Sequence, residues 1–179
     1  TFLQHLPQLR FFESRNYYID YVGLAQHYGL QTDMMDLTSD IDVALFFAMC
    51  DIPKGRTEYV CKVENKPYIG YIYCVPTYEF SMKNGKLGET FWGTKLSSIG
   101  LQPFERPGAQ KGFAYRMEKG EELKSLVYSF SYTRKDSETI YQKYSHGSTL
   151  WQDDAMARIT RNIDDSRQFS YNAFNSCVK

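Results

Sequence analysis

The chain has 179 residues, of which 42% are hydrophobic and 23% charged, and its 21 basic and 21 acidic side chains give a formal net charge of zero. This length suits one domain with its own apolar core, and the composition is not that of a disordered segment. The balanced charge excludes the basic field that nonspecific DNA or RNA binding needs, and no apolar run has transmembrane length. We therefore expect one domain over residues 1–179, with a small-molecule or protein ligand rather than nucleic acid or a membrane.

The cysteines argue against a metal centre and against a disulfide framework. The chain has four, at Cys50, Cys61, Cys74 and Cys177, with no CxxC pair and no His at zinc-finger spacing. No other His, Asp or Glu cluster has ligand spacing, so no metal site is predicted. A reduced, cytoplasmic protein is our interpretation. No signal peptide is evident, and because the chain begins with Thr1 we expect it to be truncated at its N-terminus.

The N-terminal part reads as helical. Residues 2–26 carry apolar side chains at loosely helical intervals, and Gly29 is expected to end this stretch. A short connection is predicted from Leu30 to Ser39.

The run from Ile41 to Cys50 is nearly all apolar and fits a buried helix or a buried strand. Thr38, Ser39 and Asp40 are three alternative N-caps before it, and Asp42 falls where a helix dipole favours a carboxylate. These features favour a helix.

The middle of the chain reads as strands. Tyr59–Val63 and Tyr68–Val75 are predicted to pair through the turn at residues 65–67, with Ile69, Tyr71, Tyr73 and Val75 on one face. Residues 81–101 look irregular, residues 113–115 suggest a short strand, and residues 125–132 alternate as a half-buried strand does.

The C-terminal part reads as two helices. Asp136 or Ser137 is the expected cap of a helix to about Tyr144, ended by His146-Gly147. A last helix is expected from about Asp153 to Ile163, with Asp153-Asp154 as cap and dipole complement. The tail after Asp164 is weakly patterned. Helices at both ends around a central, mostly antiparallel sheet predict an α+β fold.

Two stretches carry the chemistry. Gln26-His27-Tyr28-Gly29 places an amide, an imidazole and a phenol before the predicted turn, and an imidazole can act as acid, base or hydrogen-bond donor near neutral pH. Thr32, Asp36 and Thr38 follow; Asp36 can cap the next helix, close an Asx turn or orient His27.

The second stretch is residues 103–113. Arg106 can form a fork to a carboxylate or phosphate, and Gln110, bracketed by Gly108 and Gly112, can both donate and accept hydrogen bonds. By itself this stretch reads as a turn before a strand. The chain has no P-loop, GxGxxG, HExxH or GxSxG motif.

In order along the chain, these stretches resemble the FRG domain, a bacterial and phage family named for a Phe/Tyr-Arg-Gly motif. The family signature, roughly AQHYGLPTRLLDWT followed by ALYFA, is matched by residues 25–30, by Thr32, Asp36 and Thr38, and by residues 44–48. Its second signature, an Arg followed by AQxGxF, is matched by Arg106 and residues 109–113, and a third, LFPD-like string by residues 150–153. The resemblance covers about residues 20–160. Gln31, Asp33 and Leu37 replace the signature's Pro, Arg and Trp, and the naming motif is absent, so we expect it upstream.

The motif order also resembles that of ADP-ribosyltransferase-like folds, which pair an early Arg or His with a central Tyr, Ser or Thr and a late Glu or Gln around a split sheet. In this chain the early, central and late parts would be His27, Tyr28 or Thr32, and Gln110. Together the two resemblances imply a catalytic set of His27, Asp36 and Gln110 and a ligand-binding set of Gln26, Tyr28, Thr32 and Arg106. NAD is the candidate substrate, and no cofactor is assigned. The role would be that of an effector in bacterial defence or toxin systems.

The alternative is a noncatalytic ligand- or protein-binding module, or a sensor, in which His27, Asp36 and Gln110 join the loops to the sheet by buried hydrogen bonds. Asp33 and Leu37, which break the signature, favour this alternative, because a structural motif tolerates drift better than a catalytic one. A nuclease would need clustered carboxylates and a metal, which the sequence does not offer.

Overall fold

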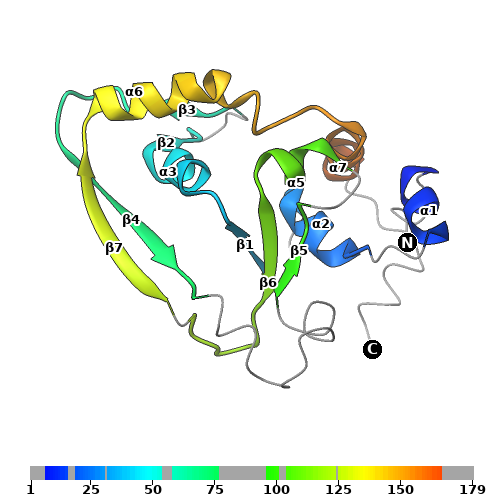
Figure 1. Ribbon diagram of the computed structural model, residues 1–179. Helices are drawn as coiled ribbons and strands as arrows, with labels where there is room; N and C mark the ends of the chain where they lie inside the picture. Colours follow the sequence, from blue (N-terminus) through cyan, green and yellow to red (C-terminus); the bar gives the residue numbers. More distant parts are fainter. Residues whose placement is uncertain are drawn as a thin grey trace.

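The computed structural model describes residues 7–15, 19–30, 32–53, 58–76, 96–100, 104–123 and 125–166. Helices and antiparallel strands form the predicted α+β fold (Figure 1). The helices are α1 (Pro7–Ser14), α2 (Tyr21–His27), α3 (Ile41–Met49), α5 (Glu105–Ala109), α6 (Arg134–Lys143), the 3-10 turn η2 (Ser145–Gly147) and α7 (Ala155–Ser166). The strands are β1 (Met34–Thr38), β2 (Cys50–Asp51), β3 (Val60–Cys61), β4 (Tyr68–Cys74), β5 (Leu96–Ser98), β6 (Gly112–Arg116) and β7 (Leu126–Tyr132).

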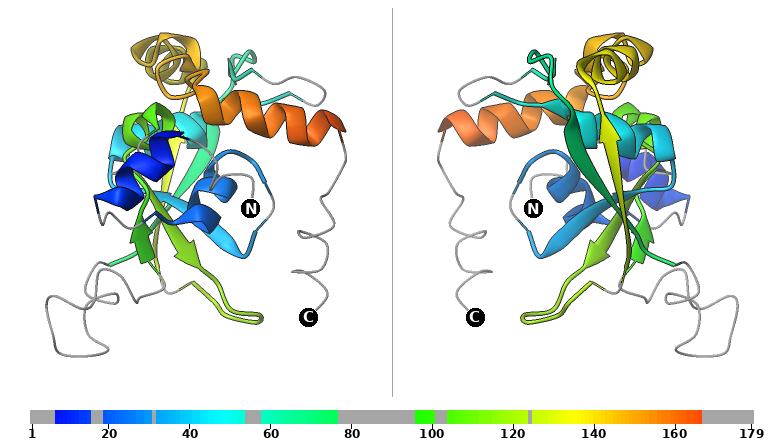
Figure 2. Two further views of the ribbon diagram at one scale, coloured as in Figure 1. Left: turned by 90° about the vertical axis from the view of Figure 1, so that its right-hand side faces the viewer. Right: turned by 90° about the vertical axis from the view of Figure 1, so that its left-hand side faces the viewer.

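The described strands form three separate sheets, all antiparallel, rather than one central sheet. Their orders are β1-β6-β5, β2-β3 and β4-β7. The long β4-β7 pair lies on one side of the molecule and the β1-β6-β5 sheet on the other, with α3 between them (Figure 1). In the side views of Figure 2 the two sheets overlap along the line of sight, and α6 lies above them. Side chains of both sheets line the cavity described below.

Helix α2 ends where the sequence predicts. Gly29 has φ +91°, its N–H donates to the Gln26 carbonyl at 2.9 Å, and the Leu30 N–H donates to the Ala25 carbonyl at 3.0 Å. This pair of bonds is a Schellman motif, which needs a residue free to take positive φ. The helical stretch predicted over residues 2–26 is two helices, because Asp20 is a non-helical N-cap that begins α2; residues 1–6 and 16–18 lie outside the described part.

The predicted connection from Leu30 to Ser39 was wrong in one respect, because it contains β1. The segment Met-Met-Asp-Leu-Thr lacks the clear alternation of a half-buried strand. It is extended because it pairs along its whole length with β6, Asp36 standing opposite Ala114. The signal for this strand therefore lies far along the chain rather than in the segment itself.

The run from Ile41 onward is the helix that its caps favour. Of the three predicted N-caps, Asp40 takes the position, and its Oδ1 accepts from the Asp42 N–H at 2.8 Å. Val43, Phe46 and Met49 recur every third residue and are buried. The helix ends one residue early, and Cys50 begins β2 instead.

The predicted hairpin between residues 59–63 and 68–75 was wrong in its pairing. Both strands exist, but β3 pairs with β2, whereas β4 pairs with β7 over seven positions. The longer register wins because it brings Tyr68 onto Tyr132, their rings 5.4 Å apart, and places Gly70 beneath the Phe130 ring. Ile69, Tyr71 and Tyr73 do share a face, which is exposed.

The cap of α6 was also predicted wrongly. Thr133 is the N-cap, and Asp136 occupies the third helical position and closes a capping box with it. Ser137 is buried inside the first turns. At α7 the prediction holds for Asp154, whose Oδ1 accepts from the Ala157 N–H at 3.0 Å.

Two other predicted segments fall partly outside the described residues. Within 81–101, residues 81–95 and 101 lie outside, and β5 occupies 96–98. The tail after Asp164 is described only to the end of α7. The short strand predicted at 113–115 is confirmed as β6.

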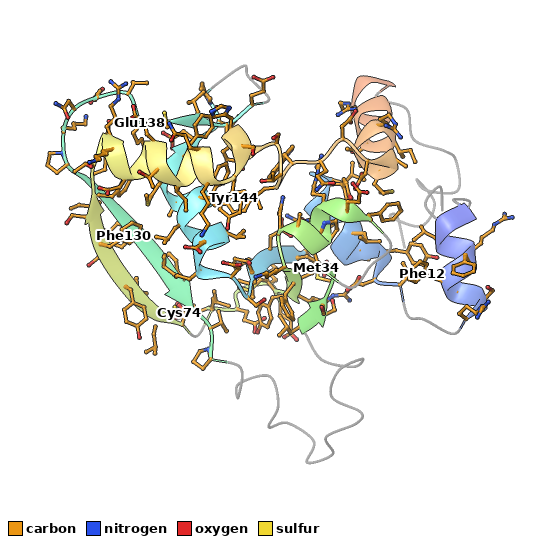
Figure 3. All side chains as sticks on the ribbon, turned by 45° about the horizontal axis from the view of Figure 1, so that its top comes forward. Phe12, Met34, Cys74, Phe130, Glu138 and Tyr144 are labelled. Atoms are coloured by element: carbon orange, nitrogen blue, oxygen red, sulfur yellow. The ribbon has the colours of Figure 1, made fainter. Side chains whose placement is uncertain are left out.

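The buried apolar side chains form two clusters, with side chains drawn in Figure 3. The first joins α1, α2 and α7 through Leu9, Leu24, Tyr28, Phe104 and Met156. The second joins α3, α6 and β7 through Val43, Phe46, Tyr132, Ile140 and Leu150. Across the parts of the chain that the structure describes, no helix has both the length and the apolar character needed to cross a membrane.

Candidate functional site

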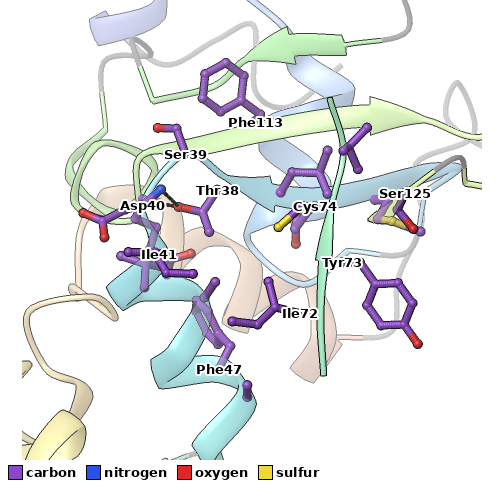
Figure 4. Close-up of a pocket in the computed structure, with 18 of the residues that line it drawn as sticks. Thr38, Ser39, Asp40, Ile41, Phe47, Ile72, Tyr73, Cys74, Phe113 and Ser125 are labelled. Atoms are coloured by element: carbon purple, nitrogen blue, oxygen red, sulfur yellow. Dashed lines mark hydrogen bonds between the residues drawn. The ribbon is translucent and has the colours of Figure 1, made fainter. Parts of the chain in front are cut away.

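A cavity of about 1210 Å³ lies where the β4-β7 pair faces β1 and α3. The side chains that line it come from helices and from sheets that are not hydrogen-bonded to one another. In Figure 4, Ile72 and Cys74 of β4 point toward Phe47 of α3, and Tyr73 points to the other side of the strand. His27, Asp36 and Gln110, the predicted catalytic set, all line this cavity.

His27 is the last residue of α2 and is 6% exposed. Its Nδ1 is 3.6 Å from the Asp36 Oδ1, beyond hydrogen-bond length, and neither ring nitrogen has a hydrogen-bond partner among the described residues. The imidazole lies against β6: a Cβ added to Gly112 would be 3.1 Å from the His27 Cε1. A buried imidazole without a partner is costly unless something else supplies one.

Asp36 reaches the cavity from the middle of β1. Its side chain is 44% exposed, so the carboxylate remains hydrated while it faces His27. It is not the cap of α3, which is Asp40, and it lies within β1 rather than in a turn. Of its three predicted roles, the position beside His27 is therefore the one that the geometry favours.

Gln110 is buried and ties three parts of the wall together. It is the C-cap of α5, its backbone carbonyl accepts from the Thr38 hydroxyl at 2.8 Å, and its Nε2 donates to the Leu150 carbonyl at 2.8 Å. The Thr38 hydroxyl in turn accepts from the Asp40 N–H at 3.0 Å, the bond dashed in Figure 4. Gln110 thus connects β1, the start of α3 and the turn before α7.

The described lining is acidic and aromatic. It includes the carboxylates of Asp36, Asp40 and Glu122, and no Lys or Arg among the residues described. Asp40 is already engaged: Lys111 Nζ lies 2.6 Å from its Oδ2, and this hydrogen bond lowers the pKa of Asp40. Such a lining favours a ligand whose enclosed part is neutral or cationic.

The predicted ligand-binding residues lie outside the described lining of this cavity. Arg106 is buried between two rings, its Cζ 4.6 Å from the Tyr28 centroid and 4.9 Å from the Trp151 centroid. Its guanidinium donates to the Gln152 carbonyl at 3.1 Å, and burial lowers its pKa. The Tyr28 hydroxyl donates to Asp154, and burial raises the pKa of that phenol. Both side chains therefore contact protein groups in the described residues.

Gln26 and Thr32 form a local contact instead of facing the cavity. The Thr32 hydroxyl donates to the Gln26 Oε1 at 2.7 Å and accepts from the Met34 N–H at 3.1 Å. This contact links the end of α2 to the start of β1.

Sequence reasoning missed the aromatic wall. Phe47, Tyr59 and Trp151 line the cavity, with the Tyr59 and Trp151 rings 5.2 Å apart and the Phe47 and Tyr59 rings 5.7 Å apart. Burial raises the pKa of Tyr59 to about 12. Phe47 was hidden in an apolar run that reads as core, Trp151 lies in the third family string without any sign of a cavity wall, and no local signal marks Tyr59. Within the described part of the chain, no group of three or more His, Cys, Asp or Glu side chains is placed to hold a metal ion.

Comparison with known proteins gives one result. The family model of the FRG domain matches residues 4–56, which span α1, α2, β1, α3 and β2 and include His27 and Asp36. The comparisons with curated proteins and with solved structures give no match. The match starts earlier than the predicted resemblance at residue 20, and it leaves the stretches around Gln110 and Trp151 outside. Residues 4–56 of this chain thus match the FRG domain, which confirms the predicted resemblance over that segment.

Proposed function

We propose that this FRG-domain protein is an ADP-ribosyltransferase-like enzyme that uses NAD and acts as an effector in bacterial defence or toxin systems, in the cytoplasm. The observation that carries the proposal is the His27 imidazole, buried on the cavity wall beside Asp36 with no partner for either nitrogen in the described residues. A ligand group in the cavity would supply the missing hydrogen bond and offset the cost of burying the ring.

The proposed reaction assigns each of the three residues a role. The bond between C1′ of the ribose and the nicotinamide nitrogen breaks, nicotinamide leaves, and an acceptor oxygen or nitrogen bonds to C1′. Asp36 stabilises the positive charge that develops on the ribose, and His27 takes the proton that the acceptor loses. Gln110 holds Thr38 in place and so positions β1, which carries Asp36.

The lining suits the nicotinamide end of this substrate. The ring of NAD is planar and carries a positive charge, and the wall provides the Phe47, Tyr59 and Trp151 rings with carboxylates nearby. The substrate's diphosphate finds no Lys or Arg in the described lining. We therefore propose that the nicotinamide ribose enters the cavity and the diphosphate stays toward solvent.

The test pairs Asp36→Asn with a matched control, Asp33→Asn. Asp33 lies three residues earlier, is exposed, stands 3.7 Å from Arg116 and is outside the described lining. Nicotinamide release from NAD, measured by chromatography, should fall at least ~10-fold in Asp36→Asn, which corresponds to about 1.4 kcal/mol of transition-state stabilisation. It should change less than ~2-fold in Asp33→Asn. Equal losses in both variants would refute the role of Asp36.

Binding is tested separately from turnover. NAD at a hundred times its dissociation constant should stabilise the protein by about 2.7 kcal/mol, seen as a raised unfolding temperature. If the full chain shows neither this shift nor nicotinamide release, the enzyme proposal fails.

The second candidate is a noncatalytic binding module or sensor, favoured by the missing Lys and Arg in the described lining and by the departures Asp33 and Leu37 from the family signature. It predicts that His27→Ala changes stability by ~1–3 kcal/mol, as for a structural group. The enzyme proposal predicts instead that this variant keeps its fold and loses nicotinamide release.

A further inference from the structure

Two free cysteines stand directly opposite each other in the shortest sheet. Cys50 of β2 is the register partner of Cys61 of β3, and both are thiols. Side chains at such directly opposed positions lie on the same face, with Cβ atoms about 4.5–5.5 Å apart. A disulfide needs Cα atoms about 4.4–6.8 Å apart and Cβ atoms about 3.5–4.5 Å apart. The pair therefore needs an approach of only about 1 Å in a sheet that is two residues long.

We propose that Cys50 and Cys61 form a reversible intramolecular disulfide when the protein meets a small-molecule disulfide such as oxidised glutathione. This inference is independent of the proposed function, since it concerns the side of α3 and β3 behind the cavity.

The two thiols differ in access, which sets the order of events. Cys61 is half-buried, whereas Cys50 is 3% exposed. The Arg134 guanidinium interacts electrostatically with Cys61 and donates to the Val63 carbonyl at 3.2 Å. Burial raises the pKa of the Cys50 thiol to about 11. Cys61 is thus the thiol that the oxidant meets, and Cys50 is the resolving one.

The exchange proceeds in two balanced steps. The Cys61 thiolate attacks one sulfur of oxidised glutathione, forming a mixed disulfide and releasing one glutathione thiolate. The Cys50 thiolate then attacks the Cys61 sulfur and releases the second glutathione. Two protein thiols lose two electrons and two protons in total; the glutathione disulfide is reduced to two thiols, which take up the protons.

The bond would act on the cavity from behind. Ala48 and Tyr59, each two residues before one of the cysteines, line the cavity. A covalent link between Cys50 and Cys61 would hold the end of α3 against the strand that follows Tyr59. The aromatic wall would then become less mobile in the oxidised protein.

The sequence allows a direct assay by peptide mapping. Trypsin cleaves after Lys54, Arg56 and Lys62 and leaves Cys50 in peptide 16–54 and Cys61 in peptide 57–62. The folded full chain is equilibrated with oxidised glutathione, its remaining thiols are alkylated, and it is digested without reductant. The expected product is the linked pair 16–54 and 57–62, which separates on adding dithiothreitol. The unfolding temperature of the oxidised protein should rise by about 5 °C, because the bond closes a loop.

Variants test the assignment. The double variant Cys74→Ser/Cys177→Ser should keep both the linked peptides and the temperature rise, whereas Cys50→Ser and Cys61→Ser should each lose both. The proposal is overturned if the wild-type digest contains no linked pair, or if Cys50 or Cys61 is found joined to Cys74 instead. Because the wild-type digest alone is decisive, the conclusion does not depend on any variant folding.

Discussion

Ser137 allows a test of how much a buried hydroxyl contributes to the stability of this fold. It is 0% exposed, its Oγ donates to the Met49 carbonyl at 2.8 Å, and the same oxygen accepts from the Lys62 N–H at 2.9 Å. One hydroxyl thus joins α6 to the end of α3 and to the residue after β3. Ser137→Ala removes this bridge and changes almost no volume.

The expected loss follows from the two groups left behind. Each buried backbone group that loses its partner costs about 1–3 kcal/mol. Met49 is buried, whereas Lys62 is only partly buried. We therefore expect the free energy of unfolding to fall by about 2–3 kcal/mol, in the lower part of the range summed over the two groups. In a domain of this size each kcal/mol lowers the unfolding temperature by roughly 2–4 °C, so the variant should unfold ~4–12 °C lower.

The matched control is Ser148→Ala. Its hydroxyl is exposed and makes one local bond, to the Ser145 carbonyl at 2.8 Å, so it should cost less than ~0.5 kcal/mol. Urea unfolding followed by circular dichroism gives both free energies. If Ser137→Ala loses no more than the control, the buried bridge does not stabilise the fold as argued.

Two further predictions concern backbone strain and pH. Gly29→Ala should lose about 1–2 kcal/mol in urea unfolding with an unchanged m-value, because φ is +91° and no atom lies within 4 Å of an added Cβ, so only backbone strain contributes; an unaltered midpoint would contradict this. Burial raises the pKa of Tyr59 to about 12, above the unfolded value of about 10, so its stabilising contribution is complete below pH 10 and is lost as the pH rises toward 12. Between pH 9 and pH 11.5 the free energy of unfolding of Tyr59→Phe should therefore fall by ~1–2 kcal/mol less than that of the wild type. Equal decreases in the two proteins would count against this assignment.

Features that depend on neighbouring residues were predictable from the sequence. The end of α2 at Gly29 and the N-cap of α3 at Asp40 each depend on bonds within five residues, so the local residue types suffice. Strand partners were not predictable in this way. The sequence marks β3 and β4 as strands, but the choice between each other and the distant β2 and β7 depends on side chains such as Phe130 that meet only in the fold.

The candidate site likewise combines residues with local signals and residues that depend on long-range contacts. His27 and Asp36 stand nine residues apart and adjoin a predicted turn, and the structure places them 3.6 Å apart on one cavity. Gln110 joins them through Thr38, a contact that only the pairing of β1 with β6 creates. The Trp151 ring lies in the cavity wall and packs against the Arg106 guanidinium. No local pattern indicates this long-range contact. The roles of these residues remain predictions.

The register of β1 against β6 also bears on where an independently folding unit can be cut from this chain. The segment that matches the family model ends at residue 56, whereas β1 takes its hydrogen bonds from residues 112–116 and β2 takes its own from residues 60–61. Expressed alone, residues 4–56 would present β1 as an unprotected edge and α3 as an uncovered apolar helix. We expect such a fragment to associate with itself rather than fold, so the segment that matches the family model is smaller than the unit of cooperative folding.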